Sequence, residues 1–411
     1  TYSAGMNING GLTLSGGARV TAVGGAAAGE NGKSYGITCI SAVTVSENAR
    51  LTSLGGKAAS SYGLYAASGL NVNAKSGGLV IAEAQGTTAN KAVSLGESAA
   101  VTVDTNTALL TGGADTDFAV WGPKNTYYVI DGSAGANKSA KDWQTIYYGS
   151  TAQSSWLDEN ARGFEYNYHA STNTAGTDST GSITMKNVII NPDSEAMPGI
   201  YFQAASSVFT LGGTAVVRGG PTSNINGAVD AGFGSLEIKA ASGTAELYAM
   251  PAKYDSTNSY SASGIYTYDN LTVDSGVNVT ALGGAITANE SNQYPSSSGI
   301  YADGMLTLSG DVTAIGGTSG RSNGIYASQN NYNTNVGETA ANIVISGKTT
   351  AIASAADGEW GESAGVRNDY GSVTVSDNAR LSAAGGSGWS SRGIYTYGTN
   401  FNNSHDIVFQ P

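Results

Sequence analysis

Residues 298–317 read SGIYADGMLTLSGDVTAIGG and contain three short segments in which apolar and polar residues alternate. These segments are Ile300–Ala302, Leu306–Leu308 and Val312–Ile315, and glycine, aspartate and serine separate them. Alternation with a period of two is typical of strands with one buried face, and the separating residues favour turns. The stretch therefore predicts three strands, and it ends on a glycine pair.

The same pattern recurs from one end of the sequence to the other. Each copy begins with a small residue before its first strand, at Gly5, Gly36, Gly63, Ala92, Ala119, Gly163, Gly199, Gly227, Gly264, Gly299, Gly324, Gly365 and Gly393. The next residue is apolar and is predicted to face the core: Met6, Ile37, Leu64, Val93, Val120, Phe164, Ile200, Ala228, Ile265, Ile300, Ile325, Val366 and Ile394. The mean spacing of about 32 residues is typical of solenoid repeats.

Three strands per copy with no helix between them predict an all-β fold, a right-handed parallel β-helix with three strands per rung and about 13 rungs. We expect residues 1–411 to form a single β-helix domain, with an irregular, decorated stretch at about 118–198. An antiparallel sandwich is the structural alternative. It does not explain three strand segments in a fixed order with a core-facing residue at one fixed position.

The composition limits the function. A net charge of −12 argues against binding to nucleic acid or to an anionic lipid surface, because both require basic side chains. The single cysteine, Cys39, excludes an internal disulfide and a cysteine-based zinc site, and we interpret it as a buried core residue. No apolar run approaches the roughly 18 residues of a membrane span, so we expect no direct membrane insertion.

Residues suited to catalysis are sparse. The only histidines, His169 and His405, are too far apart in the repeat pattern to form a catalytic triad or a multi-histidine metal site. Residues 361–365 match GxSxG, but they lead into a strand instead of forming a strand–turn–helix. Paired carboxylates are the remaining candidates, and we interpret them as solvated turn residues: Asp115 with Asp117, Asp158 with Glu159, Asp193 with Glu195, and Glu359 with Glu362. We therefore predict no catalytic residues.

Four aspartates occupy similar corner positions after the first strand: Asp230, Asp269, Asp303 and Asp369. Carboxylates stacked along a solenoid corner suit Ca²⁺, but Asp-Asn and Asp-Gly pairs are also ordinary turn sequences. We predict no cofactor and no metal ligands, with Ca²⁺ as the alternative.

Aromatic residues are the predicted ligand-binding residues. They occupy the outward position of the first strand in seven copies: Tyr65, Trp121, Tyr201, Tyr266, Tyr301, Tyr326 and Tyr395. Rings on successive rungs are about 4.8 Å apart, which roughly matches the rise of a sugar in an extended glycan, and their flat faces suit CH contacts with sugars. The alternative is that these side chains only stabilise the sheet by stacking across strands.

The sequence SGIYA, LTLSG and VTAIGG within residues 298–317 resembles the glycine-rich parallel β-helix repeats of surface or secreted proteins of gut and anaerobic Gram-positive bacteria. The resemblance is clearest over residues 5–113 and 199–395. It implies an exported protein, extracellular or on the cell surface, of adhesin-like or carbohydrate-binding type. The NTD, GHG and RxK signatures of β-helical pectate lyases and polygalacturonases are absent from the strands.

The sequence thus predicts a non-enzymatic, adhesin-like β-helix. Its partner is expected to be a polysaccharide, a surface glycoprotein or a host or matrix protein, bound through a lateral face. One alternative is a polysaccharide-degrading enzyme of the pectin lyase or hydrolase type, with carboxylates of adjacent rungs in a groove. The other is a structural stalk without a ligand.

Overall fold

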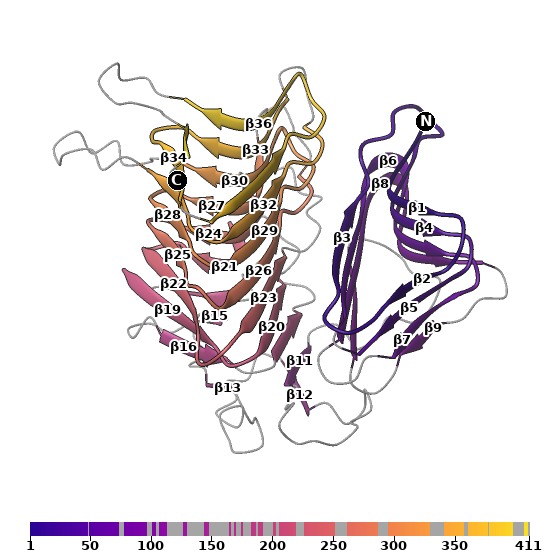
Figure 1. Cartoon of the computed structure of the whole chain (residues 1–411), viewed down its shortest axis with the longest axis horizontal. Coiled ribbons are helices and arrows are strands. Elements are labelled where there is room, and N and C mark those ends of the chain that lie inside the picture. Colours follow the sequence, from indigo (N-terminus) through magenta and orange to yellow (C-terminus); the bar gives the residue numbers. More distant parts are fainter. Residues whose placement is uncertain are drawn as a thin grey trace. The chain divides into compact units, whose positions relative to one another are not determined.

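The computed structural model describes residues 1–47, 49–73, 78–96, 101–103, 107–112, 126–129, 144–147, 164–165, 168–169, 174–175, 182–185, 188–191, 200–202, 205–218, 226–250, 261–286, 295–328, 341–356, 361–376, 378–397 and 407–409. In this part of the chain the regular structure consists of strands, and no helix has the length and hydropathy of a membrane span. The chain divides into two compact units (Figure 1). Unit 1 comprises Thr1–Pro123 and Gly132–Trp143, and unit 2 comprises Lys124–Asp131 and Gln144–Pro411.

Unit 2 is a solenoid built from three stacked sheets, and a regular coil supplies one strand to each of them (Figure 1). The first sheet contains β18 (Ile200–Tyr201), β21 (Gly227–Ala231), β24 (Ser263–Thr267), β27 (Ser296–Ala302), β30 (Arg321–Ala327), β33 (Glu362–Asn368) and β36 (Ser390–Thr396). The second contains β13 (Phe164–Glu165), β16 (Ser182–Met185), β19 (Ser206–Leu211), β22 (Ser235–Ala240), β25 (Leu271–Val273), β28 (Leu306–Leu308), β31 (Ile343–Ile345), β34 (Val373–Val375) and β37 (Ile407–Phe409). The third contains β12 (Gln144–Tyr147), β11 (Thr126–Val129), β17 (Val188–Asn191), β20 (Thr214–Arg218), β23 (Ala245–Met250), β26 (Val277–Leu282), β29 (Asp311–Ile315), β32 (Lys348–Ile352) and β35 (Arg380–Ala384). A short pair, β14 (Tyr168–His169) with β15 (Thr174–Ala175), lies outside these sheets.

Unit 1 repeats this construction. Its larger sheet contains β1 (Tyr2–Ile8), β3 (Arg19–Val23), β4 (Lys33–Cys39), β6 (Arg50–Ala66), β8 (Gly78–Leu95) and β10 (Thr107–Gly112). Its smaller sheet contains β2 (Leu12–Leu14), β5 (Ala42–Ser46), β7 (Gly69–Asn73) and β9 (Val101–Val103). The strand β6 is long because the third strand of one coil continues into the first strand of the next, so that it pairs with both β3 and β4.

The predicted fold class is confirmed, because three strands per coil form parallel sheets around an apolar interior. The predicted count of 13 rungs is wrong, since the solenoid that the described residues form has about eight turns. Some predicted rungs are not parallel coils. The strands β11 and β12 pair antiparallel, and Phe164 pairs antiparallel with Met185 in the second sheet. Most of the irregular stretch at 118–198 lies outside the described residues. The right-handed coiling and the single domain over residues 1–411 stay predictions.

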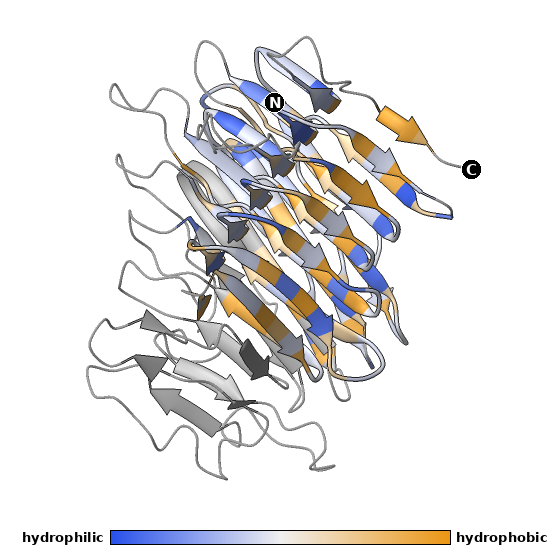
Figure 2. Cartoon of the chain, turned by 90° about the vertical axis from the view of Figure 1, so that its left-hand side faces the viewer, coloured by the Kyte–Doolittle hydropathy of each residue, from blue (hydrophilic) through white to orange (hydrophobic). Residues whose placement is uncertain are grey.

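The core is built by residues that meet in register on successive coils. Ile265, Ile300, Ile325 and Val366 pair with one another along the first sheet, and each is fully buried. Figure 2 shows the resulting alternation of hydrophobic and hydrophilic residues along the stacked strands. Burying each of these side chains away from water stabilises the fold by roughly 1.5–3 kcal/mol.

One predicted register is wrong. The core-facing residue of β21 that pairs with Ile200 and Ile265 is Val229, not Ala228. Two small residues, Gly227 and Ala228, precede Val229, so alignment on the first of them placed the strand one residue too early. As a result Asp230, and not Val229, lies in the outward column of the first sheet.

A glycine precedes the core residue because the backbone of the third strand packs against this position. At Gly36, an added Cβ atom would lie 2.4 Å from the backbone nitrogen of Leu54 and 2.5 Å from the carbonyl oxygen of Gly63. Backbone atoms on both sides leave no room for a side chain. The small residue that marks each repeat is therefore required by close packing of two strands.

Replacing Gly36 with alanine is expected to lower the free energy of unfolding of unit 1 by about 1–3 kcal/mol, the usual cost of overpacking. Gly10 in the same unit is the matched control, because nothing lies within 4 Å of its added Cβ atom. Gly10→Ala should leave stability within about 0.5 kcal/mol of the parent. Urea denaturation followed by circular dichroism measures both, and equal effects would contradict the close-packing explanation.

A buried serine connects the glycine pairs of successive coils. Ser297 Oγ donates to the carbonyl oxygen of Gly284 at 2.6 Å and accepts from the N–H group of Gly317 at 3.0 Å. In unit 1, Ser34 Oγ bonds to Gly25 and Gly56 in the same way, at 2.7 and 2.9 Å. These hydroxyls satisfy corner backbone groups that would otherwise be buried without a partner.

Candidate functional site

The outward positions of the first sheet form a single column in unit 2. The strand register aligns Tyr201, Asp230, Tyr266, Tyr301, Tyr326, Arg367 and Tyr395 at one position. Five predicted binding residues thus share this column, which we call the tyrosine column. Of the other two, Tyr65 lies on β6 in unit 1, and Trp121 lies outside the described residues.

The rings of the tyrosine column meet in two different geometries. Tyr266 and Tyr301 stack with their ring centroids 5.1 Å apart and their planes 15° from parallel. Tyr301 and Tyr326 are 4.9 Å apart but perpendicular. Tyr266 and Tyr301 are partly exposed, whereas Tyr326 is buried. Among these three predicted binding residues, only Tyr266 and Tyr301 therefore have parallel, partly exposed rings.

One buried carboxylate holds both stacked rings. The Tyr301 hydroxyl donates to Asp303 Oδ1 at 2.7 Å, and the Tyr266 hydroxyl donates to Asp303 Oδ2 at 3.3 Å. Burial, and then the charge of Asp303, raise the pKa of both tyrosines well above the usual range. Both hydroxyls therefore remain protonated donors at physiological pH, and the ring positions are fixed.

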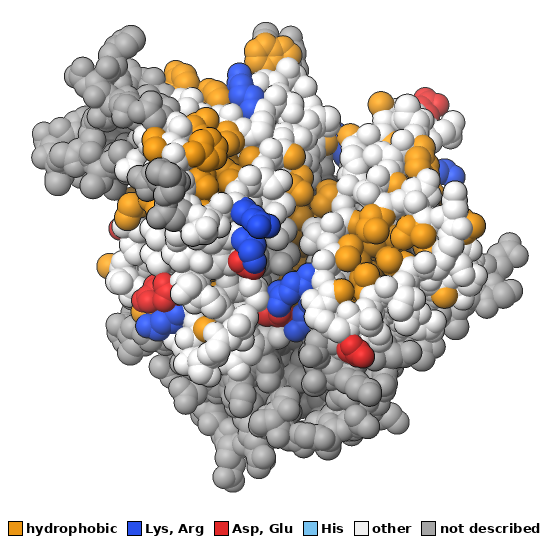
Figure 3. Space-filling view, viewed as in Figure 1, with side chains coloured by type: hydrophobic (Ala, Val, Ile, Leu, Met, Phe, Trp, Pro, Cys, Tyr) orange, Lys and Arg blue, Asp and Glu red, His pale blue; other side chains and the backbone are white. Residues whose placement is uncertain are grey.

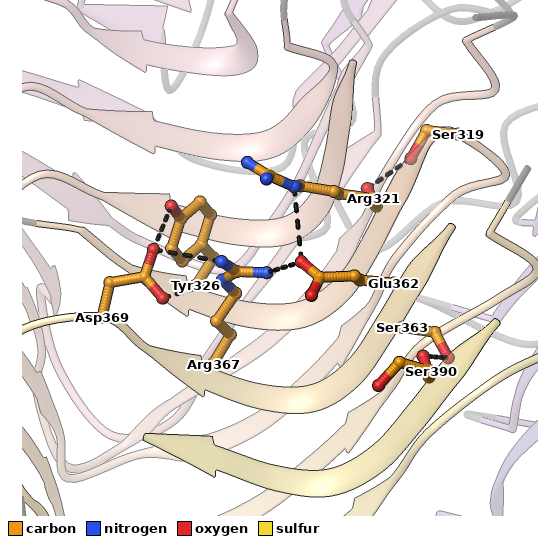
Figure 4. Close-up of polar contacts among 8 residues, drawn as sticks. All are labelled: Ser319, Arg321, Tyr326, Glu362, Ser363, Arg367, Asp369 and Ser390. Carbon is orange, nitrogen blue, oxygen red and sulfur yellow. Dashed lines mark hydrogen bonds and ion pairs between the residues drawn. The ribbon is translucent and has the colours of Figure 1, made fainter. Parts of the chain in front are cut away.

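The next part of the column is an ionic network (Figure 4). The Tyr326 hydroxyl donates to Asp369 Oδ2 at 2.7 Å, and Arg367 Nε donates to Asp369 Oδ1 at 2.9 Å. Arg367 also donates through Nη1 to Glu362 Oε2 at 2.8 Å, and Arg321 Nε lies 3.5 Å from that same oxygen. Two carboxylates thus neutralise Arg367 inside the network.

Arg367 continues the aromatic column in place of a tyrosine. Its guanidinium carbon lies 5.2 Å from the ring centroid of Tyr326 and 5.2 Å from that of Tyr395. Burial is the largest single influence on the pKa of Arg367 and would lower it, but Asp369, Tyr326 and Glu362 together outweigh burial and raise it. Burial alone would raise the pKa of Glu362, but its hydrogen bond to Arg367 and the neighbouring positive charges lower it.

Asp230 is the buried acid of the column. Its side chain is 3% exposed, and its Oδ1 atom has no hydrogen-bond partner in the part of the chain that the structure describes. Burial raises the pKa of Asp230 to about 7, although hydrogen bonds from backbone groups at Asn226, Gly232 and Gly227 lower it. The Asp230 carboxyl is therefore partly protonated near neutral pH.

The four aspartates that the sequence placed at equivalent corners do not align. Asp303 and Asp369 are equivalent, since each directly follows its first strand and donates its N–H group to the preceding coil. Asp230 lies within β21, and Asp269 lies one position further along the corner. Within the described residues, no group of three or more His, Cys, Asp or Glu side chains could hold a metal ion.

The catalytic candidates resolve into structural roles or lie outside the described residues. Ser363 of the GxSxG match is buried inside β33, so it is not a nucleophile at a strand–turn–helix. Glu362 belongs to the ionic network, and the other residues of the carboxylate pairs lie outside the described residues. Cys39 is fully buried, as predicted.

Three exposed side chains beside the tyrosine column escaped the sequence analysis. Phe233 follows β21, Tyr268 follows β24 and Met305 follows β27, and they are 58%, 47% and 41% exposed. We call these three residues the corner strip. Tyr268 is close enough to Tyr266 to contribute to the raised pKa of Tyr266. Single apolar residues in turns have no periodicity, so only the stacking of coils reveals them as a group.

Unit 1 has an aromatic column of its own. Tyr35 and Tyr62 stack with centroids 4.7 Å apart and planes 10° from parallel, and Tyr2 lies 5.4 Å from Tyr35. The predicted Tyr65 touches Tyr35 edge-on at 6.3 Å. This column lies two residues before the core residue, on the other side of it from Tyr65, and the sequence analysis missed it.

Charged side chains are few on the face drawn in Figure 3. Hydrophobic side chains gather there on unit 1 in the region that β1, β2 and β3 border (Figures 1 and 3). The core-facing residues of that coil are only partly buried: Met6, Ile8, Leu12 and Val20.

Comparisons of the chain with protein-family models, with curated proteins and with solved structures gave no match.

Proposed function

We propose that this protein is a non-enzymatic, adhesin-like solenoid that binds glycan, free or on a surface glycoprotein, through the lateral face of unit 2. The observation that supports this most is the Tyr266–Tyr301 pair, with parallel, partly exposed rings 5.1 Å apart. Because the two rings stack on each other, a sugar contacts the parts of the rings that stay exposed, which offer apolar surface to its CH groups. We further propose an extracellular or cell-surface location, which the resemblance of the repeats supports.

The pair is preorganised for binding. Asp303 accepts a hydrogen bond from each ring, so neither tyrosine has to be ordered when a ligand arrives. The parallel pairing of β24 with β27 fixes the spacing of the two rings. Preorganisation lowers the entropic cost of association, which is a large part of the cost of binding a flexible chain.

The polysaccharide-cleaving alternative needs a carboxyl group that can give up and take up a proton beside the substrate. In the ionic network, Arg367 holds the pKa of Glu362 down and also neutralises Asp369. These two groups are therefore suited to holding side chains in place. The stalk alternative does not explain why aromatic rings stay partly exposed on adjacent coils.

Replacing Tyr301 with valine is expected to weaken glycan binding about 2- to 12-fold, because the stacked pair loses one ring and an aromatic contact contributes about 0.5–1.5 kcal/mol. Tyr301→Phe should keep most of the affinity, since it removes only the hydroxyl. A glycan array of the intact chain identifies the ligand, and calorimetry with that ligand compares the variants.

Tyr62→Val is the matched control, because it removes one ring of the stacked pair in unit 1. It should leave binding unchanged while producing a similar loss of stacking. A folded Tyr301→Val variant with parental affinity would count against the proposal. Release of reducing ends from any polysaccharide on the array would overturn the non-enzymatic assignment.

A further inference from the structure

The corner strip brings three exposed side chains onto successive coils. Phe233, Tyr268 and Met305 occupy the turns that lead from the first sheet to the second in three adjacent coils. Parallel strands place equivalent turns about 4.8 Å apart. Thr267 pairs with Ala302 and Leu271 pairs with Leu306, so Tyr268 is the first residue of its turn and Met305 is the last residue of the next, and the strip crosses the coils obliquely. Exposed apolar side chains on successive coils indicate an interaction surface, whereas single, scattered ones do not.

Hydrogen bonds between coils fix the turns that carry the strip. Ser235 Oγ donates to Asp269 Oδ2 at 3.1 Å, which joins the turn of Phe233 to the turn of Tyr268. The N–H group of Met305 donates to Asn270 Oδ1 at 2.8 Å, which joins the turn of Tyr268 to the next. The strip is therefore held as a unit, and binding would not have to order it.

The charged side chains in the turns of the strip have one sign. Asp269 lies in the second turn, and the buried Asp303 begins the third turn and holds the stacked tyrosines. The turns themselves, residues 232–234, 268–270 and 303–305, contain no lysine or arginine. This surface repels carboxylate or sulfate groups, and its carboxylate and amide oxygens accept hydrogen bonds from hydroxyl groups.

We propose that the corner strip is the contact surface of the glycan site and that it selects a neutral, hydroxyl-rich glycan chain that crosses the three coils. This inference rests on the proposed function. Phe233, Tyr268 and Met305 contact the sugars, while the partly exposed Asp269 accepts hydrogen bonds from sugar hydroxyls. An acidic glycan binds less well because its carboxylates meet the Asp269 carboxylate at the surface.

The test uses the intact chain and a triple variant, Phe233→Ser, Tyr268→Ser and Met305→Ser. All three positions are exposed, so the variant should fold as the parent does. The probes are cellohexaose, xylohexaose and mannohexaose as neutral glycans and hexagalacturonate as an acidic one. Ile40→Ser in unit 1 is the matched control, because Ile40 is 59% exposed.

The expected result is that the parent and the Ile40→Ser control bind at least one neutral probe, and that the triple variant binds it at least tenfold more weakly. Hexagalacturonate should bind at least tenfold more weakly than that probe. Equal affinity of the triple variant, or tighter binding of hexagalacturonate, would overturn this inference.

If Tyr301→Val loses binding while the triple variant keeps it, the proposed function survives and the corner strip does not. Failure of the parent to bind any probe overturns the neutral-glycan assignment, and an empty glycan array overturns the proposed function as well.

Discussion

Replacing Arg367 with methionine is expected to lower the free energy of unfolding of unit 2 by about 3–5 kcal/mol, because removing one partner of a buried ion pair leaves the other charge uncompensated. Arg367 is 7% exposed and Asp369 is 8% exposed. Without the guanidinium, Asp369 would keep only its hydrogen bond from Tyr326 among the partners drawn in Figure 4. Urea denaturation of the intact chain, followed by circular dichroism, measures the change.

Lys348→Met is the matched control for this prediction. Lys348 Nζ lies 3.4 Å from Asp311 Oδ2, but the two side chains are 65% and 53% exposed. A surface pair of this kind contributes roughly 0–1 kcal/mol, so its loss should be close to the error of the measurement. If the two variants lose the same stability, the network around Arg367 is not the stabilising feature that its geometry indicates.

Replacing Asp230 with asparagine is expected to stabilise unit 2 above pH 7 and to flatten its stability as a function of pH. Burial raises the pKa of Asp230 from 3.8 to about 7, so the folded state binds one proton more than the unfolded state between these values. Stability therefore falls as the pH rises from about 4 to about 7, by about 1.4 kcal/mol per pH unit. Asparagine cannot ionise, so the variant should gain roughly 2–4 kcal/mol at pH 8 and little or nothing at pH 4.

Urea denaturation at pH 4, 6 and 8 tests this sign. Asp311→Asn is the control, because it removes an acid of the same size from an exposed position. The parent and the control should lose stability over this range more steeply than Asp230→Asn does. A variant that is less stable than the parent at pH 8 would show that the carboxylate form of Asp230 is the stabilising one.

The fold could be predicted because its determinants repeat. Every coil places an aliphatic residue such as Ile300 after a small residue, and a period of two leaves one choice of buried face. The same reasoning failed at Ala228, where two small residues in a row gave two acceptable registers. It also failed at Phe164, because a single apolar residue carries no information about whether its strand runs parallel or antiparallel.

The site could be predicted only in part. The alignment of Tyr266, Tyr301 and Tyr326 followed from the repeat, but their orientation did not. Orientation depends on Asp303 and Asp369, which read as ordinary turn residues in the sequence. Their hydrogen bonds reach across coils, which a pattern within one repeat does not encode.

Two further features depend on contacts between repeats. In the sequence, Ser297 is one of many polar residues. In the structure, its hydroxyl joins the glycine pairs of two coils. Arg367 broke the aromatic pattern in the sequence, yet it stacks between Tyr326 and Tyr395 as a ring would. A cation between two aromatic faces preserves the column through cation–π attraction.

Hydrogen–deuterium exchange of the intact chain with and without its glycan tests most directly whether the lateral face of unit 2 is the binding surface. At saturating glycan, we predict slower amide exchange in residues 232–235, 268–271 and 303–306, with unit 1 unchanged. Protection confined to unit 1, or absent from these three turns while the glycan is bound, would contradict the account.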